Sequence, residues 1–163
     1  MINRNAGFTI IEIVAVLIVM SIIAAFAIGR GRVSSADLKV QTEVLKSRLR
    51  HAQSRAMNDT APWGLQTDNS GGRYWLFRYD PAAAPPLRKI NLPGEQADTV
   101  YLAANKISMT PGTYSFDERG IPYYALYSAT PPGLALTANR DIVLSKGSES
   151  HTISITRHTG FIE

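Results

Sequence analysis

Hydrophobic and polar residues follow three successive patterns along the chain, and the first is an apolar segment near the N-terminus. Residues 13–28 carry no charge, and Ser21 is the one polar residue among them. As a helix, residues 8–28 would measure roughly 31 Å at ~1.5 Å per residue, which matches the hydrocarbon core of a bilayer. The pattern predicts a membrane-spanning helix with one carboxylate, Glu12, a single turn inside its end.

A second pattern, with helical periodicity, covers residues 37–57. Its apolar residues recur at spacings of three, four or seven and form one stripe: Leu38, Leu45, Leu49, Ala52 and Ala56. Gly29 and Gly31 precede it, and each glycine costs up to ~1 kcal/mol in a helix, so we expect the helix to break there. The sequence therefore predicts a membrane and assembly helix over residues 8–29 and an amphipathic stem helix over residues 30–57.

From residue 58 onward the period changes to two, which is typical of β-strands. We predict strands over residues 62–67, 73–79, 87–92, 140–144 and 151–157, turns over 68–72 and 146–148, and a closing turn and strand over 159–162. Residues 100–109 fit neither pattern clearly. The fold class predicted is α+β, in which the long N-terminal helix packs on an antiparallel β domain formed by residues 58–163.

The apolar segment begins with a short motif made of Gly7, Phe8 and Glu12, in which the glutamate lies five residues after the glycine. This arrangement resembles the processing site of type IV prepilins and type II secretion pseudopilins. The resemblance implies that prepilin peptidase removes a leader of residues 1–7, cuts between Gly7 and Phe8, and methylates the new amine of Phe8. It also implies that Glu12 is the assembly glutamate, and that Gly29 stands where many pilins carry a proline.

Three later segments extend the resemblance over the chain. Residues 45–56 resemble the stem helix of the H-type pseudopilins and of the mannose-sensitive haemagglutinin pilus protein C group. Residues 114–122 resemble the strand and F-D-x-x-G-x-P turn of the same family, and residues 159–162 resemble its T-G-x-I ending. The resemblance implies an H/T-type minor pilin or pseudopilin. Such a subunit would sit in the inner membrane with a periplasmic C-terminal domain and then enter a filament. Its partners would be prepilin peptidase, other pilin or pseudopilin subunits, the inner-membrane assembly platform and the lipid bilayer.

Two other interpretations of the N-terminus are open at this point. Residues 13–27 have the composition of a secretory-signal core, and Ala25-Phe26-Ala27 fits a signal-peptidase site. Against it, Arg4 is the single basic side chain before the run, and Glu12 would place a charge at the start of the core. A plain membrane anchor would also explain the run, but it gives Glu12 no role, and the basic residues on both sides leave its orientation undecided.

Positive charge is concentrated in the predicted stem. Residues 30–57 hold seven basic residues against two acidic ones, whereas residues 58–163 hold nine against ten. A solvated helix face, or contact with anionic lipid and neighbouring subunits, explains this distribution. DNA capture by a minor pilin of an uptake pilus is the alternative function, with Arg140, Lys146 and Arg157 as the candidate phosphate contacts.

The sequence shows no constellation for catalysis, cofactor binding or a metal site. The chain has no cysteine, and His51, His151 and His158 lack the spacing of zinc ligands. Asp117 and Glu118 are adjacent, so on a strand they would point to opposite faces and could not act as a pair. Calcium binding there, by analogy with major pseudopilins, would lack a surrounding ligand cluster. We therefore expect a structural subunit without a cofactor, which is the substrate of an enzyme and not itself an enzyme.

Overall fold

The computed structural model describes residues 10–84, 86–94, 96–124 and 136–163, and for residues 24–36 it gives only the backbone. The chain divides into two compact units, Met1–Asp37 and Leu38–Glu163. A single helix, α1 (Ile10–Met57), has residues in both units.

Gly29 and Gly31 lie within α1, so the helix break that we predicted at these glycines is wrong. Glycine weakens a helix by up to ~1 kcal/mol, but it keeps the backbone N–H that proline lacks. The hydrogen-bond ladder of the helix can therefore continue through both positions, and the cost is spread over a helix of 48 residues.

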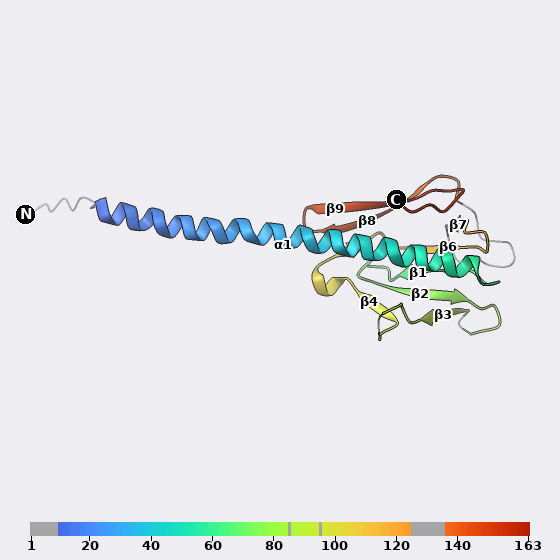
Figure 1. Ribbon diagram of the computed structural model, residues 1–163. Helices are drawn as coiled ribbons and strands as arrows, with labels where there is room; N and C mark the ends of the chain where they lie inside the picture. The colour runs from blue at the N-terminus through green and yellow to red at the C-terminus, as the bar shows by residue number, and fades with distance from the viewer. Residues whose placement is uncertain (1–9, 85, 95, 125–135) are drawn as a thin grey trace, which may run out of the picture. The chain divides into compact units, whose positions relative to one another are not determined.

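The second unit contains the C-terminal part of α1 and two antiparallel sheets (Figure 1). In chain order the elements are β1 (Trp63–Thr67), β2 (Arg73–Tyr79), β3 (Leu87–Ile90), β4 (Thr99–Tyr101), the 3₁₀ turn η1 (Ala103–Asn105), β5 (Ser108–Met109), β6 (Thr113–Phe116), β7 (Pro122–Tyr123), β8 (Arg140–Lys146) and β9 (Glu149–Ile155). Sheet A has the order β3-β2-β1-β6-β7, with β4 pairing to the start of β2 beside β3. Sheet B has the order β5-β8-β9. This is the α+β arrangement that the sequence predicted.

The predicted apolar stripe of α1 lies at the centre of the core. Its members are each no more than 1% exposed: Leu38, Leu45, Leu49, Ala52 and Ala56. The same core cluster includes Leu65, Tyr74 and Phe116 from sheet A and Ile142 and Ile153 from sheet B. Burying one large aliphatic side chain contributes about 1.5–3 kcal/mol, so burial of the stripe is a substantial part of the stability of this core.

Most predicted strands are confirmed with small changes at their ends. The predicted strand over residues 73–79 is β2, and the predicted strand over 87–92 ends early as β3 because Leu92 turns into the core, where it is 2% exposed. The ambiguous residues 100–109 divide among β4, η1 and β5. The predicted terminal strand is reduced to one bridge, between Ile155 and Ile162.

Candidate functional site

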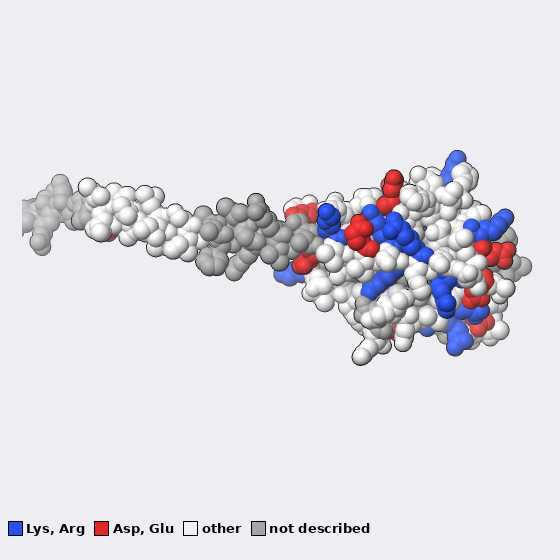
Figure 2. Space-filling model, in the orientation of Figure 1, with Lys and Arg blue, Asp and Glu red and all other residues white. Residues whose placement is uncertain are grey.

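The first unit exposes a continuous apolar helix surface. Every large hydrophobic residue from Ile10 to Ile23 is between 47% and 83% exposed. Figure 2 draws this part of α1 almost entirely white, because Glu12 is its single charged residue. An exposed apolar surface of this length is typical of a region that contacts lipid or other proteins.

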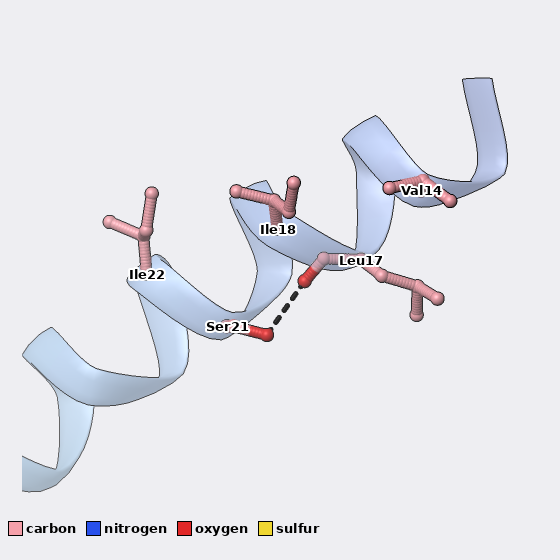
Figure 3. Close-up of a pocket in the computed structure, with 5 residues that line it drawn as sticks. All are labelled: Val14, Leu17, Ile18, Ser21 and Ile22. Atoms are coloured by element: carbon pink, nitrogen blue, oxygen red, sulfur yellow. Dashed lines mark hydrogen bonds between the residues drawn. The ribbon is translucent and has the colours of Figure 1, made fainter. Parts of the chain in front are cut away.

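One face of this helix combines four aliphatic side chains with a serine, as Figure 3 shows: Val14, Leu17, Ile18, Ser21 and Ile22. The Ser21 hydroxyl donates a hydrogen bond to the Leu17 carbonyl oxygen one turn earlier, at 2.7 Å. A serine that is satisfied within its own helix can enter an apolar environment without leaving an unpaired hydroxyl. The face is therefore suited to apolar contact along its whole length.

Glu12 lies in the first turn of α1, where a carboxylate is favoured by the helix dipole. The assembly role of Glu12 stays a prediction. The predicted cleavage site, Gly7 and Phe8, lies outside the described residues, as do the side chains of residues 24–28.

Among the residues that the structure describes, no helix is both long enough and apolar enough to cross a membrane.

The second unit, Leu38–Glu163, is called the head from here on. In it, polar side chains beside the apolar stripe of α1 bind two turns that are distant in the sequence. The Gln53 amide nitrogen donates to two carbonyl oxygens, that of Gly120 at 3.0 Å and that of Thr159 at 3.1 Å. One turn earlier, the Arg50 guanidinium donates to the Ile162 carbonyl oxygen at 2.8 Å. These contacts fix the F-D-x-x-G-x-P turn and the T-G-x-I ending against the same face of α1.

The two turns also require glycine where they meet Gln53. Gly160 has a φ of +63°, and a Cβ added to it would lie 2.3 Å from the Gly120 carbonyl oxygen. Within the first turn, Asp117 accepts hydrogen bonds from the backbone N–H groups of Arg119 at 2.9 Å and Ile121 at 2.8 Å. Its second oxygen accepts one from the Tyr123 hydroxyl at 3.0 Å. Asp117 is thus a buried structural carboxylate, whereas Glu118 is exposed.

The three candidate DNA contacts do not form one cluster. Arg140 begins β8 and Lys146 ends it, so they stand about 20 Å apart at ~3.3 Å per residue. Arg157 follows β9 near Arg140, and its backbone N–H donates to the Asn139 side chain at 3.2 Å. The Arg157 guanidinium also donates to the Thr137 carbonyl oxygen at 2.8 Å.

Arg140 makes several contacts within its own subunit. Its guanidinium donates to the carbonyl oxygens of Thr113 at 2.6 Å and Tyr124 at 3.1 Å. It also lies over the Tyr114 ring, 4.2 Å from the centroid. Burial lowers the pKa of Arg140. Arg140 therefore connects sheet B to sheet A.

The histidines show no metal site within the described residues, where no group of three or more His, Asp or Glu side chains is placed to hold an ion. His51 is half-buried on α1, and burial, with Arg55 nearby, lowers its pKa. His151 and His158 are exposed in sheet B and in the turn after it.

Two comparisons with known proteins bear on this arrangement. Residues 2–28 match the prokaryotic N-terminal methylation motif. The fold is similar to the crystal structure of the type IV minor pilin FimU from Pseudomonas aeruginosa strain PAO1, with a TM-score of 0.50 and 14% sequence identity, over 79% of this chain and 88% of that chain. No curated protein sequence matches the chain significantly.

The chain thus combines an N-terminal methylation motif over residues 2–28 with an α+β fold similar to that of the minor pilin FimU. This combination agrees with the resemblance to minor pilins and pseudopilins found in the sequence. Neither comparison singles out the mannose-sensitive haemagglutinin group.

Proposed function

We propose that this chain is a minor subunit of a type IV pilus-like filament. In this proposal prepilin peptidase cuts between Gly7 and Phe8 and methylates Phe8, and residues 8–29 hold the precursor in the inner membrane with the head in the periplasm. The assembly platform then moves the subunit into the filament. The observation that carries the proposal is the methylation motif over residues 2–28, in which residues 10–23 form an exposed apolar helix with one carboxylate. A secretion pseudopilus uses the same parts, and the likeness to the minor pilin FimU favours the pilus.

Glu12 has a specific role in this proposal. After cleavage the Phe8 amine is a cation at the positive end of a helix, and a carboxylate four residues later can bind that amine or the amine of a neighbouring subunit. In hydrocarbon this attraction is weakly screened, whereas an unpaired carboxylate is costly. An intersubunit pair would set the register between two apolar helices that otherwise slide past each other at nearly equal energy.

Glu12 substitutions test this role. We expect Glu12→Val to leave membrane insertion and cleavage intact and to lower incorporation into filaments, with Glu12→Asp in between because its reach is shorter. The measurement compares processed protein in membranes with protein in sheared filaments. Normal incorporation of processed Glu12→Val would show that this glutamate does not set the register.

DNA capture is the second candidate function, and it is favoured by the position of Arg140 and Arg157 at one end of sheet B. Since phosphate binding releases counterions, true binding would weaken steeply with salt. Because Arg140 is committed to contacts within the head, we expect at most weak binding of duplex DNA by the full-length chain. Binding that falls steeply with salt, and that Arg157→Gln abolishes, would establish DNA capture instead.

A further inference from the structure

The outer edge of β9 carries backbone groups that are ready to pair. β9 is the last strand of sheet B and pairs with β8 along its whole length. Ser154 and Glu163 exchange backbone hydrogen bonds in both directions, at 3.4 and 3.0 Å, so the backbone groups of Ser154 point away from β8. Because a strand alternates with a period of two, those of Ser150 and Thr152 point the same way. Within the described part of the chain, no strand pairs with β9 at these two residues.

β3 has a matching open edge on sheet A. The Asp80 N–H donates to the Pro86 carbonyl oxygen at 2.7 Å, so the residue just before β3 bonds toward β2. By the same alternation Arg88 bonds toward β2, whereas the N–H and C=O groups of Leu87 and Lys89 point outward. The described residues place no strand on that side of β3. Each edge thus offers two donors and two acceptors with the same spacing.

The two edges also have the right relative direction. The turn before β2 meets β5, because the Met109 N–H donates to the Gly71 carbonyl oxygen at 2.9 Å. Met109 pairs with Leu144, which in turn pairs with His151 near the start of β9. β2 and β9 therefore start at the same end of the head, and β3 runs opposite to both. Figure 1 shows β9 and β3 on opposite sides of the head.

We propose that β9 of one subunit pairs in antiparallel fashion with β3 of a second copy of this chain beside it in the same orientation. The shared orientation rests on the proposed function, since subunits of one filament point the same way. Placing Ser150 opposite Lys89 and Thr152 opposite Leu87 forms four backbone hydrogen bonds and uses every open group on both edges. The contact is heterologous, with different edges on the two copies, so it can repeat from subunit to subunit.

Side chains along the two edges are compatible with this pairing. In the stated register the exposed Glu149 lies diagonally across from the exposed Arg88 on one face, an attractive cross-strand pair. A lysine at an edge normally discourages pairing. The Lys89 ammonium, however, lies over the Trp75 ring at 4.3 Å and donates to the Thr99 hydroxyl at 3.4 Å. It therefore covers the face of sheet A and leaves the edge accessible.

Disulfide cross-linking tests the register directly, because the natural chain has no cysteine. In this register His151 and Arg88 face each other at a non-hydrogen-bonded position, with Cα atoms about 4.5 Å apart, a distance that a disulfide can bridge. His151→Cys and Arg88→Cys would be co-expressed as separate full-length chains and oxidised in isolated membranes. We expect a mixed dimer from the two chains together. The control replaces His151→Cys with Asp141→Cys, an exposed position on β8 away from the edge.

A second pair of variants separates backbone pairing from simple proximity. Thr152→Pro removes an N–H that points outward, so it spares the β8–β9 ladder, whereas Thr152→Val keeps the N–H. Added to His151→Cys, Thr152→Pro should lower the mixed dimer about fivefold or more, since each lost hydrogen bond weakens pairing. Thr152→Val should leave the yield unchanged.

Three results would overturn the pairing: a mixed dimer no more abundant than the Asp141→Cys control, equal yields from Thr152→Pro and Thr152→Val, or cross-linking of His151→Cys to a different protein. Processing and filament incorporation are measured on the same samples. A processed and incorporated chain without the mixed dimer rejects the edge pairing alone, whereas a chain that is neither cut nor incorporated rejects the proposed function.

Discussion

At the scale of single residues, a few polar side chains at the border of the apolar stripe determine how the head closes on α1. Gln53 is the clearest case, because its amide nitrogen bonds to two turns that lie 67 and 106 residues further along the chain. Arg50 adds a third bond to the C-terminal segment. Both side chains point to backbone carbonyls, so they fix the path of the main chain and not the identity of a partner side chain.

Removing the Gln53 amide should therefore destabilise the head more than its surface position suggests. We expect Gln53→Ala to lower the free energy of unfolding by about 1–3 kcal/mol, since two carbonyl oxygens lose their donor. Gly160→Ala should cost more, because the added Cβ meets the Gly120 carbonyl oxygen at a positive φ. Denaturant unfolding of the full-length chain in detergent measures both changes. Ser54→Ala, an exposed neighbour on α1, serves as the control and should stay within about 0.5 kcal/mol of wild type. A Gln53→Ala variant as stable as that control would refute this role.

The sequence alone indicated some of the candidate functional and structural residues and gave no signal for others. Gly7, Phe8 and Glu12 form a short linear motif, so their spacing is readable without a structure. Gln53 and Arg50 gave no such signal, because polar residues beside an apolar stripe are usually solvated and their partners lie far away in the chain. The glycine and proline that follow Asp117 indicated a turn at this position. Its hydrogen bonds with Ile121 and Tyr123 could be found only in the structure.

At the scale of elements, periodicity predicted what each segment buries. The spacing of Leu38, Leu45 and Leu49 identified the buried face of α1, and the alternation in residues 73–79 identified β2. Two features escaped this reasoning. α1 continues through Gly29 and Gly31, since helix propensity is a weak term in a long helix. The burial of Phe77, on the sheet face opposite Tyr74, was also not predicted; Gly64 faces Phe77 from β1 and leaves room for its ring.

The junction of α1 with sheet A depends on one carboxylate just after the helix. Asp59 accepts hydrogen bonds from the Arg78 guanidinium on β2, at 2.8 Å, and from the Trp63 indole on β1, at 2.9 Å. The hydrogen bond from Arg78, followed by that from Trp63, holds the pKa of Asp59 well below its usual range. At one end of the head, Asp59 therefore connects the end of α1 to both β1 and β2.

Acid should remove this connection selectively. Because the folded-state pKa of Asp59 lies below its unfolded value, its stabilisation is complete above the usual aspartate pKa and is lost as the pH falls through the folded-state pKa. We expect Asp59→Asn to lower the free energy of unfolding at neutral pH by about 1 kcal/mol and to approach wild type in strong acid. Denaturant unfolding at a series of pH values measures this. Asp141→Asn, which removes an exposed carboxylate on β8, is measured as the control. A difference between Asp59→Asn and wild type that is independent of pH would contradict the assignment.

At the scale of the whole molecule, the two units have opposite surfaces. Residues 10–23 expose their apolar side chains, whereas the head buries a core assembled from α1 and both sheets. An exposed apolar helix of this kind is not expected in a domain that functions without contacts to lipid or to other proteins. This division fits the proposed function, in which the N-terminal helix makes contacts in a membrane or a filament and the head presents a separate surface.

The mature N-terminus of the chain recovered from sheared filaments tests this account most directly. Intact-mass and N-terminal analysis should find a chain that begins at Phe8 and carries one methyl group on its amine, with Gly7 and the residues before it absent. Replacing Gly7 by a bulky residue should leave the full-length precursor in the membrane. A mature chain that begins at Ile28 would instead identify residues 1–27 as a secretory signal, and it would contradict the processing, the assembly helix and the role of Glu12 together.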